Sequence, residues 1–128
     1  LDLLVNGEAV SPNEPMTRPF LWTEAKGYRP LPVPPGRRHA EGVAMNDRGL
    51  ILLKVCDSTE EAGADYFLLV DGRLVALPRP REGIAEYTDL NETGWLAGCI
   101  VPEGPKGEDH RSWRGFIAAP LAKRLGLG

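Results

Sequence analysis

The stretch Phe67-Leu68-Leu69-Val70-Asp71-Gly72-Arg73-Leu74-Val75-Ala76-Leu77 decides the fold class of this chain. Two apolar runs flank an Asp-Gly pair, which is the strongest short-range signal for a β-hairpin. A type I′ turn needs positive φ angles, and glycine adopts them without steric cost. The stretch therefore predicts two short antiparallel strands, over residues 67–70 and 74–77.

Related motifs recur in the same order about 46 residues earlier. Phe20-Leu21-Trp22 corresponds to Phe67-Leu68-Leu69, Lys26-Gly27 to Asp71-Gly72, Leu31-Pro32 to Leu77-Pro78, and Asn46-Asp47-Arg48-Gly49 to Asn91-Glu92-Thr93-Gly94. A third copy begins at Gly115-Phe116-Ile117-Ala118, and a partial copy precedes Pro19, with Leu3-Leu4-Val5 as a strand and Asn6-Gly7 as its turn. The 128-residue chain is therefore predicted to be one repeat domain of about 2.8 units. These are a partial unit 1–18, units 19–65 and 66–113, and a partial unit 114–128.

The two Asn-x-x-Gly motifs predict a second hairpin in each unit. Asn at the first position and Gly at the fourth suit a type I turn that is closed by a left-handed glycine. These turns would join residues 42–45 to 50–56 and residues 87–90 to 95–101. Prolines at 30, 32, 34, 35, 78 and 80 lack the N–H that a central ladder needs, so they mark strand ends. The expected fold is all-β, with antiparallel four-stranded units; the alternative is a β-sandwich.

The order of these motifs resembles the HAF repeat, a bacterial and largely extracellular family with tandem units similar to four-stranded propeller blades. The resemblance covers Pro19 to Ala118. It implies a propeller-like fold and an extracellular or periplasmic location. One departure is that Leu50-Ile51-Leu52-Leu53-Lys54 lacks the strand-four glycine that the next unit has as Gly98. The family has no established catalytic residues, so the resemblance implies a fold and not a mechanism.

Composition narrows the classes of partner. Lys and Arg number 15 against 18 Asp and Glu, a net charge of -3, so nucleic acid is not expected as a ligand. No apolar run approaches the length of a membrane-spanning helix, so no membrane span is predicted. Cys56 and Cys99 lack metal-binding spacing. Alternation points both side chains to the same face of their strands, so we expect free thiols and no disulfide.

Two small basic clusters are the main candidates for binding. Arg37 with Arg38, and Arg79 with Arg81, follow strand two of neighbouring units and would share one rim, where a polysaccharide or other anion could bind. A second candidate is the polar segment that contains His110 and Trp113. The alternative for both is a solvated loop. Trp22 and Trp95 are expected in the core, because large aromatic residues on half-buried strands are usually packed.

No catalytic constellation is visible in the sequence. The two histidines lie in different loops without a Ser/His/Asp spacing. The acidic stretch from Asp57 to Asp65 lacks the regular ligands and the glycine of a calcium loop. No catalytic residue, metal site or cofactor is therefore predicted.

The leading hypothesis is a non-catalytic extracellular β-repeat module that acts as a binding or scaffolding surface for a polysaccharide or protein ligand. The alternatives are a small hydrolase or lyase with its site in a loop funnel, and a structural fragment of a longer repeat protein. Fewer than three units cannot close a propeller ring, which needs at least four blades. The two partial units complement each other, so we expect a homo-oligomer, a dimer with a shared blade.

Overall fold

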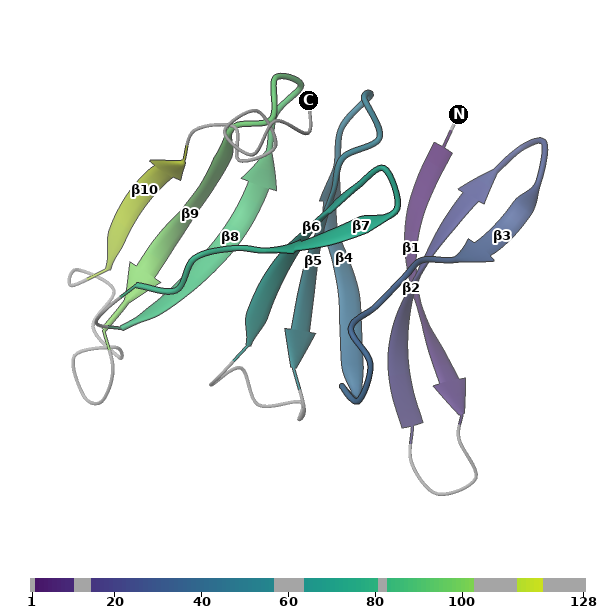
Figure 1. Cartoon of the computed structure of the whole chain (residues 1–128), viewed down its shortest axis with the longest axis horizontal. Helices are drawn as coiled ribbons and strands as arrows, with labels where there is room; N and C mark the ends of the chain where they lie inside the picture. Colours follow the sequence, from purple (N-terminus) through teal and green to yellow (C-terminus); the bar gives the residue numbers. More distant parts are fainter. Residues whose placement is uncertain (1, 11–14, 57–63, 81–82, 103–112, 119–128) are drawn as a thin grey trace.

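The computed structural model describes residues 2–10, 15–56, 64–80, 83–102 and 113–118 of the chain. These residues form three antiparallel sheets, which stand side by side in Figure 1. The first sheet contains β1 (Asp2–Val10), β2 (Pro15–Thr23) and β3 (Gly27–Pro30). The middle sheet contains β4 (His39–Met45), β5 (Ile51–Cys56), β6 (Asp65–Val70) and β7 (Arg73–Ala76). The last sheet contains β8 (Ile84–Leu90), β9 (Leu96–Val101) and β10 (Arg114–Ala118).

The predicted hairpins are confirmed. Strands β6 and β7 pair across Asp71-Gly72, where φ is 48° and 79°, as a type I′ turn requires. Gly49 and Gly94 close the turns between β4 and β5 and between β8 and β9, with φ of 83° and 87°. Strand β3 ends at Pro30, where the proline run was expected to end it.

The predicted turn at Asn6-Gly7 is wrong. Strand β1 continues through both residues, which pair with Pro19 and Arg18 of β2. The Asn6 side chain does not close a turn, because it bridges to the next sheet: its Nδ2 donates to the Gly42 carbonyl at 3.0 Å, and its Oδ1 accepts the Gly42 N–H at 2.6 Å. A tertiary contact thus outweighs the local preference of Asn-Gly for a turn.

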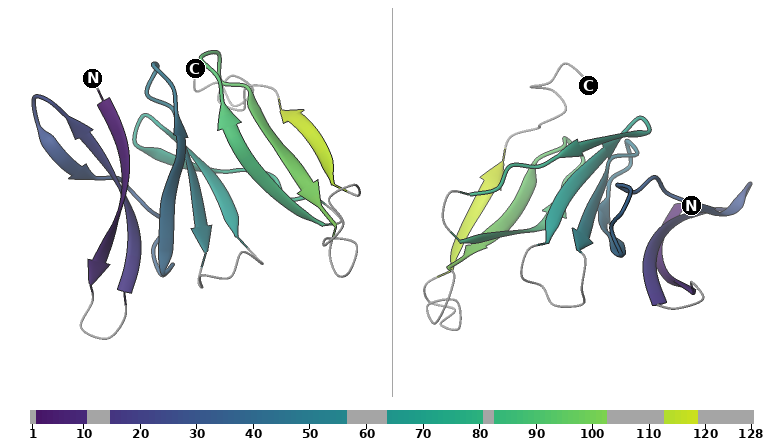
Figure 2. Two further views of the ribbon diagram at one scale, coloured as in Figure 1. Left: turned by 180° about the vertical axis from the view of Figure 1, so that it is seen from behind. Right: turned by 60° about the horizontal axis from the view of Figure 1, so that its bottom comes forward.

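The sheets are offset by half a unit from the boundaries expected from the sequence. The middle sheet combines a hairpin of the expected unit 19–65 with a hairpin of the expected unit 66–113. Figure 2 shows from two further directions that the three sheets pack through their faces. Within the described residues no sheet closes on itself and no ring of sheets forms.

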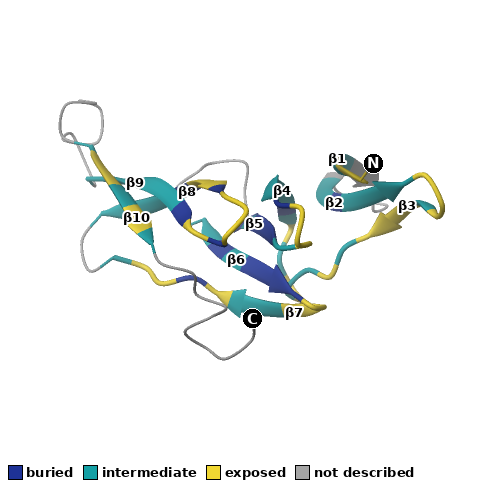
Figure 3. Cartoon of the chain, turned by 90° about the horizontal axis from the view of Figure 1, so that it is seen from above, coloured by how far each residue is buried: buried dark blue, intermediate teal, exposed yellow. Residues whose placement is uncertain are grey.

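Two apolar clusters hold the three sheets together. One lies between the middle and last sheets and includes Leu52, Leu68, Tyr87 and Leu96. The other lies between the first and middle sheets, where Ile51, Leu53 and Leu69 pack with Leu4 and Leu31. Figure 3 shows that the buried residues concentrate on β5 and β6, in the centre of the stack. The middle sheet, covered on both faces, supplies most of the core.

The prediction that Trp95 lies in the core is wrong. Its side chain is exposed in the last sheet, and the predicted core position of Trp22 is wrong as well, because Trp22 is only half-buried in the first sheet and belongs to neither apolar cluster. Trp95 directly precedes β9, and alternation with the inward-facing Leu96 turns it to the face of the last sheet that no described sheet covers. The three-dimensional order of the sheets, and not the strand pattern, determines this exposure.

Asn46 and Asn91 connect neighbouring sheets through their turns. In each turn the Asn Oδ1 accepts backbone N–H groups, those of Arg48 and Leu50 in one case and those of Thr93 and Trp95 in the other. Asn46 is buried, and its Nδ2 also donates to the Asn91 carbonyl at 3.0 Å. The N–H of Asp47 donates to Glu92 Oε2 at 2.9 Å. The turn of the middle sheet is therefore bonded to the turn of the last sheet.

Asn46→Ala is expected to lower the free energy of unfolding by about 2 kcal/mol, because it removes the acceptor of the part-buried Arg48 and Leu50 N–H groups and the bond from Asn46 Nδ2 to the Asn91 carbonyl. Asn91→Ala, in an exposed turn, is expected to cost about 1 kcal/mol. Urea denaturation of the two variants measures the difference. Equal losses would show that the bond between the turns contributes nothing.

Cys56 and Cys99 are free thiols, as the alternation of their strands predicts. Among the described residues no helix has the length and apolar character needed to cross a membrane.

Candidate functional site

One arginine from each of the two predicted basic clusters contacts the same carboxylate. Arg37 precedes β4, Arg79 follows β7, and both guanidinium groups contact Asp65 at the start of β6. The distance from Arg37 Nη1 to Asp65 Oδ2 is 2.8 Å, and Arg79 bonds to the other carboxylate oxygen, Oδ1. Arg37 also donates from Nη2 to the Val55 carbonyl, at 3.4 Å.

A third arginine joins this group from the first sheet. Arg18 in β2 donates from Nη1 to the Arg38 carbonyl at 2.7 Å and from Nη2 to the Arg37 carbonyl at 3.2 Å. Next to it, His39 Nδ1 lies 3.3 Å from Thr17 Oγ1. We define the arginine cluster as Arg18, Arg37, Arg38 and Arg79; the guanidinium groups of Arg37 and Arg79 contact Asp65, and that of Arg18 contacts the Arg37 and Arg38 carbonyls. It spans the junction of the first and middle sheets.

The exposure of the cluster differs between its members. The Arg79 side chain is 68% exposed, whereas those of Arg37 and Asp65 are largely covered. A carboxylate of one negative charge cannot saturate the five N–H donors that each guanidinium presents. Arg79 is therefore the member of the cluster best placed to contact a ligand from solution.

The pKa of Asp65 is lowered from its ordinary value. Partial burial acts to raise it, but the hydrogen bonds and positive charges of Arg37 and Arg79 outweigh that effect. Asp65 therefore stays ionised throughout the neutral range and remains bound to both arginines.

The other candidates do not join this cluster among the described residues. Trp113 lies directly before β10 in the last sheet and is half-buried. Arg81 and His110 lie outside the described residues, as do Asp57, Glu60 and Glu61 of the acidic stretch.

Two further groups have shifted pKa values without forming a reactive centre. Burial and the neighbouring Glu86 carboxylate raise the pKa of the Cys99 thiol, which lies 3.7 Å from Glu86 Oε2. A raised pKa keeps the thiol protonated, the opposite of what a nucleophile needs. Burial also raises the pKa of Tyr87, whose hydroxyl donates to the Pro78 carbonyl at 2.9 Å. In the described part of the chain no three His, Cys, Asp or Glu residues come together to hold a metal ion.

Sequence reasoning missed Asp65 and Arg18 as members of the site. The sequence pattern places Asp65 only in the acidic stretch tested against a calcium loop, and nothing local distinguishes Arg18 from other arginines. One signal could have indicated Asp65: it is an acidic residue directly before an apolar strand, and it lies between the two basic clusters in the sequence.

No protein-family model, curated protein or solved structure matches this chain.

Proposed function

We propose that this chain is a non-catalytic, propeller-like β-module that binds an anionic ligand, with an acidic polysaccharide as the chemical class that best fits the arginine cluster. The observation that carries the proposal is the convergence of Arg37 and Arg79, which are separated in the sequence, on Asp65. The resemblance to the HAF repeat supports an extracellular or periplasmic module of a bacterium. The stacked sheets would serve as the scaffold that holds the cluster in place.

The presence of Asp65 in the cluster predicts how substitutions change its affinity for an anion. Its carboxylate competes with an external anion for the same guanidinium donors. Removing its charge in Asp65→Asn frees those donors, so affinity for an anion should rise. Removing the charged donor in Arg79→Gln should lower affinity about fivefold, which corresponds to about 1 kcal/mol, the upper value for an exposed ion pair.

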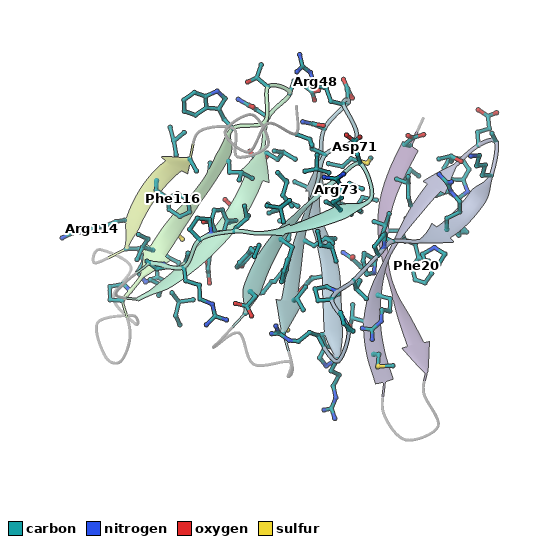
Figure 4. All side chains as sticks on the ribbon, in the orientation of Figure 1. Phe20, Arg48, Asp71, Arg73, Arg114 and Phe116 are labelled. Carbon is teal, nitrogen blue, oxygen red and sulfur yellow. The ribbon has the colours of Figure 1, made fainter. Side chains whose placement is uncertain are left out.

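Binding of polygalacturonate, measured by isothermal titration calorimetry at low salt, tests the proposal. We expect weaker binding for Arg79→Gln, tighter binding for Asp65→Asn, and no change for Arg48→Gln. Arg48 is a matched control because it is exposed in a turn at the opposite end of the middle sheet (Figure 4). Dextran, a neutral polysaccharide, should not bind.

The gain in anion affinity from Asp65→Asn should depend on pH in a defined way. Because the pKa of Asp65 is lowered, its charge competes at every pH above its ordinary value of 3.8 and is lost only as pH falls through the lowered pKa. The higher affinity of Asp65→Asn over the wild-type protein should therefore be constant from about pH 5 to pH 8.

Equal weakening of polygalacturonate binding by Arg48→Gln and Arg79→Gln, or no binding by the wild-type protein, would overturn the proposal.

A further inference from the structure

Both ends of the stack of sheets expose large apolar side chains. In the described part of the chain these are Leu3, 45% exposed, Tyr28, 66%, Trp95, 44%, and Ile117, 74%. The first two belong to the first sheet and the other two to the last sheet. The middle sheet, which has a neighbour on each face, has none.

The apolar residues of the first sheet form a continuous outer face. Leu4 packs against the middle sheet and Asn6 bonds to Gly42, so alternation turns Leu3 and Val5 the other way. The outer face then follows the register across the sheet: Leu3 pairs with Trp22 and Trp22 with Tyr28, while Val5 pairs with Phe20. Figure 4 shows Phe20 projecting from β2 away from the middle sheet. We name these five residues the first-sheet end face.

The last sheet has an outer face of a different character. Leu96, Phe116 and Ala118 pack toward the middle sheet. Alternation therefore turns Ala97 and Cys99 of β9 outward, together with Ile117, which pairs with Ala97. Trp95, two residues before Ala97, belongs to the same side. We name Trp95, Ala97, Cys99 and Ile117 the last-sheet end face.

Each end face has a buried counterpart in the middle sheet. In the first sheet, Val5 and Phe20 form a cross-strand pair that is equivalent to the pair Leu53 and Phe67 in the middle sheet. Leu53 and Phe67 pack toward the first sheet, whereas Val5 and Phe20 have no sheet beside them among the described residues. At the other end, Ala97 and Ile117 stand where the middle sheet has Leu52 and Leu68, which pack toward the last sheet. The end faces thus present the two halves of an interface that this chain already forms twice.

We infer that the last-sheet end face of one copy docks on the first-sheet end face of a second copy. The two faces are complementary in the size of their side chains. The last-sheet end face has the small Ala97 where the middle sheet has Leu52, and the first-sheet end face has the large Trp22 where the middle sheet has Leu69. In the docked pair, the large Trp22 side chain of the second copy would fill the space that the small Ala97 leaves on the last sheet.

A hydrogen-bond donor at the rim of the last sheet supports the same contact. Asn46 Nδ2 donates across the junction of the middle and last sheets to the Asn91 carbonyl. Asn91 Nδ2 occupies the equivalent position on the last sheet and has no acceptor among the described residues. It is placed to donate to the next sheet of the stack.

The interface is heterologous, because two different faces meet. Such contacts produce a ring when the rotation closes and a filament when it does not. Two copies joined at both ends contain six sheets, within the range of four to eight blades that propellers use. This contact joins two sheets by their faces, whereas the sequence predicts a blade whose strands come from two chains. The first and last sheets each have three strands from one chain, so both can present a complete face to a second copy.

Multi-angle light scattering up to about 100 μM protein tests the docking with two single variants. Ile117→Glu disables only the last-sheet end face, and Tyr28→Glu disables only the first-sheet end face. Both side chains are exposed, so both variants should fold, which circular dichroism checks. Ala76→Glu, an exposed position on β7 outside both end faces, is the control.

We expect the wild-type protein and Ala76→Glu to have a mass of at least twice the 14.0 kDa of the chain, and each end-face variant to have the mass of one chain. An equimolar mixture of the two end-face variants should form a dimer, because one intact face of each kind remains. A monomeric wild-type protein would overturn the inference, and so would a mixture that stays monomeric or variants that still associate. Polygalacturonate binding can be measured on the monomeric Ile117→Glu variant, whose arginine cluster is intact, so the proposed function is tested independently of the docking.

Discussion

Gly98→Ala is expected to destabilise the protein by about 3 kcal/mol or more, because its methyl group would overlap the backbone carbonyl oxygen of Glu86. The methyl group would also lie 2.9 Å from the Phe116 ring. Gly98 pairs with Tyr87, directly before the bulge in β8. Backbone cannot move aside as a flexible side chain can, so β8 and β9 would have to separate. Tyr87 would then lose its edge-to-face contact with Phe116, whose ring centroid is 5.1 Å away.

Gly115→Ala is the matched control for this substitution. Gly115 lies on the neighbouring strand β10, and the nearest atom to its added methyl group is the Gly98 carbonyl oxygen at 3.9 Å, an ordinary contact. Its effect on the free energy of unfolding should stay within about 0.5 kcal/mol. Urea denaturation at a fixed protein concentration measures both. Similar losses for the two variants would show that the close approach of β8 to β9 is not the cause.

Leu52→Ala is expected to cost about 3 kcal/mol, within the range for removing a fully buried leucine. Leu52 is completely buried in β5 and belongs to the apolar cluster that joins the middle and last sheets. The cavity would open between two sheets. Backbone amides of β8 and β9 should therefore exchange hydrogen faster, as well as those of β5.

Leu52→Met is the control that distinguishes the effect of a cavity from the effect of any substitution at this position. Methionine has nearly the same volume, so the loss should stay below about 1.5 kcal/mol. A loss of stability confined to the middle sheet in hydrogen exchange, with β8 and β9 unchanged, would contradict the role of Leu52 in the junction.

The hairpins were predictable because their causes lie within a few residues. Asp71-Gly72 and the two Asn-x-x-Gly motifs need positive φ at a glycine, and the flanking apolar strands fix their registers. Asn6-Gly7 failed for a reason outside its own sequence. The side chain of Asn6 bonds to Gly42 of the next sheet, which no local pattern reveals.

The candidate site was predictable only in part. The sequence identified Arg37 and Arg79 as equivalent basic positions that share a rim. It did not show that one carboxylate, Asp65, holds both guanidinium groups, nor that Arg18 reaches the same junction from β2. Ion pairs between strands far apart in the chain depend on distances that are set only when the sheets pack.

The sequence alone determined that this protein is all-β and located the turns at Asp71-Gly72 and at the two Asn-x-x-Gly motifs with the hairpins that they close, because turn geometry and strand alternation act over neighbouring residues. Only the tertiary structure decided how the hairpins are shared among three sheets and which apolar faces are covered. Leu53 and Val5 occupy the same place in the strand pattern, yet Leu53 is buried and Val5 belongs to an end face. The physical reason is that burial depends on which sheet stands next to a residue, a property of the whole arrangement and not of the strand that carries it.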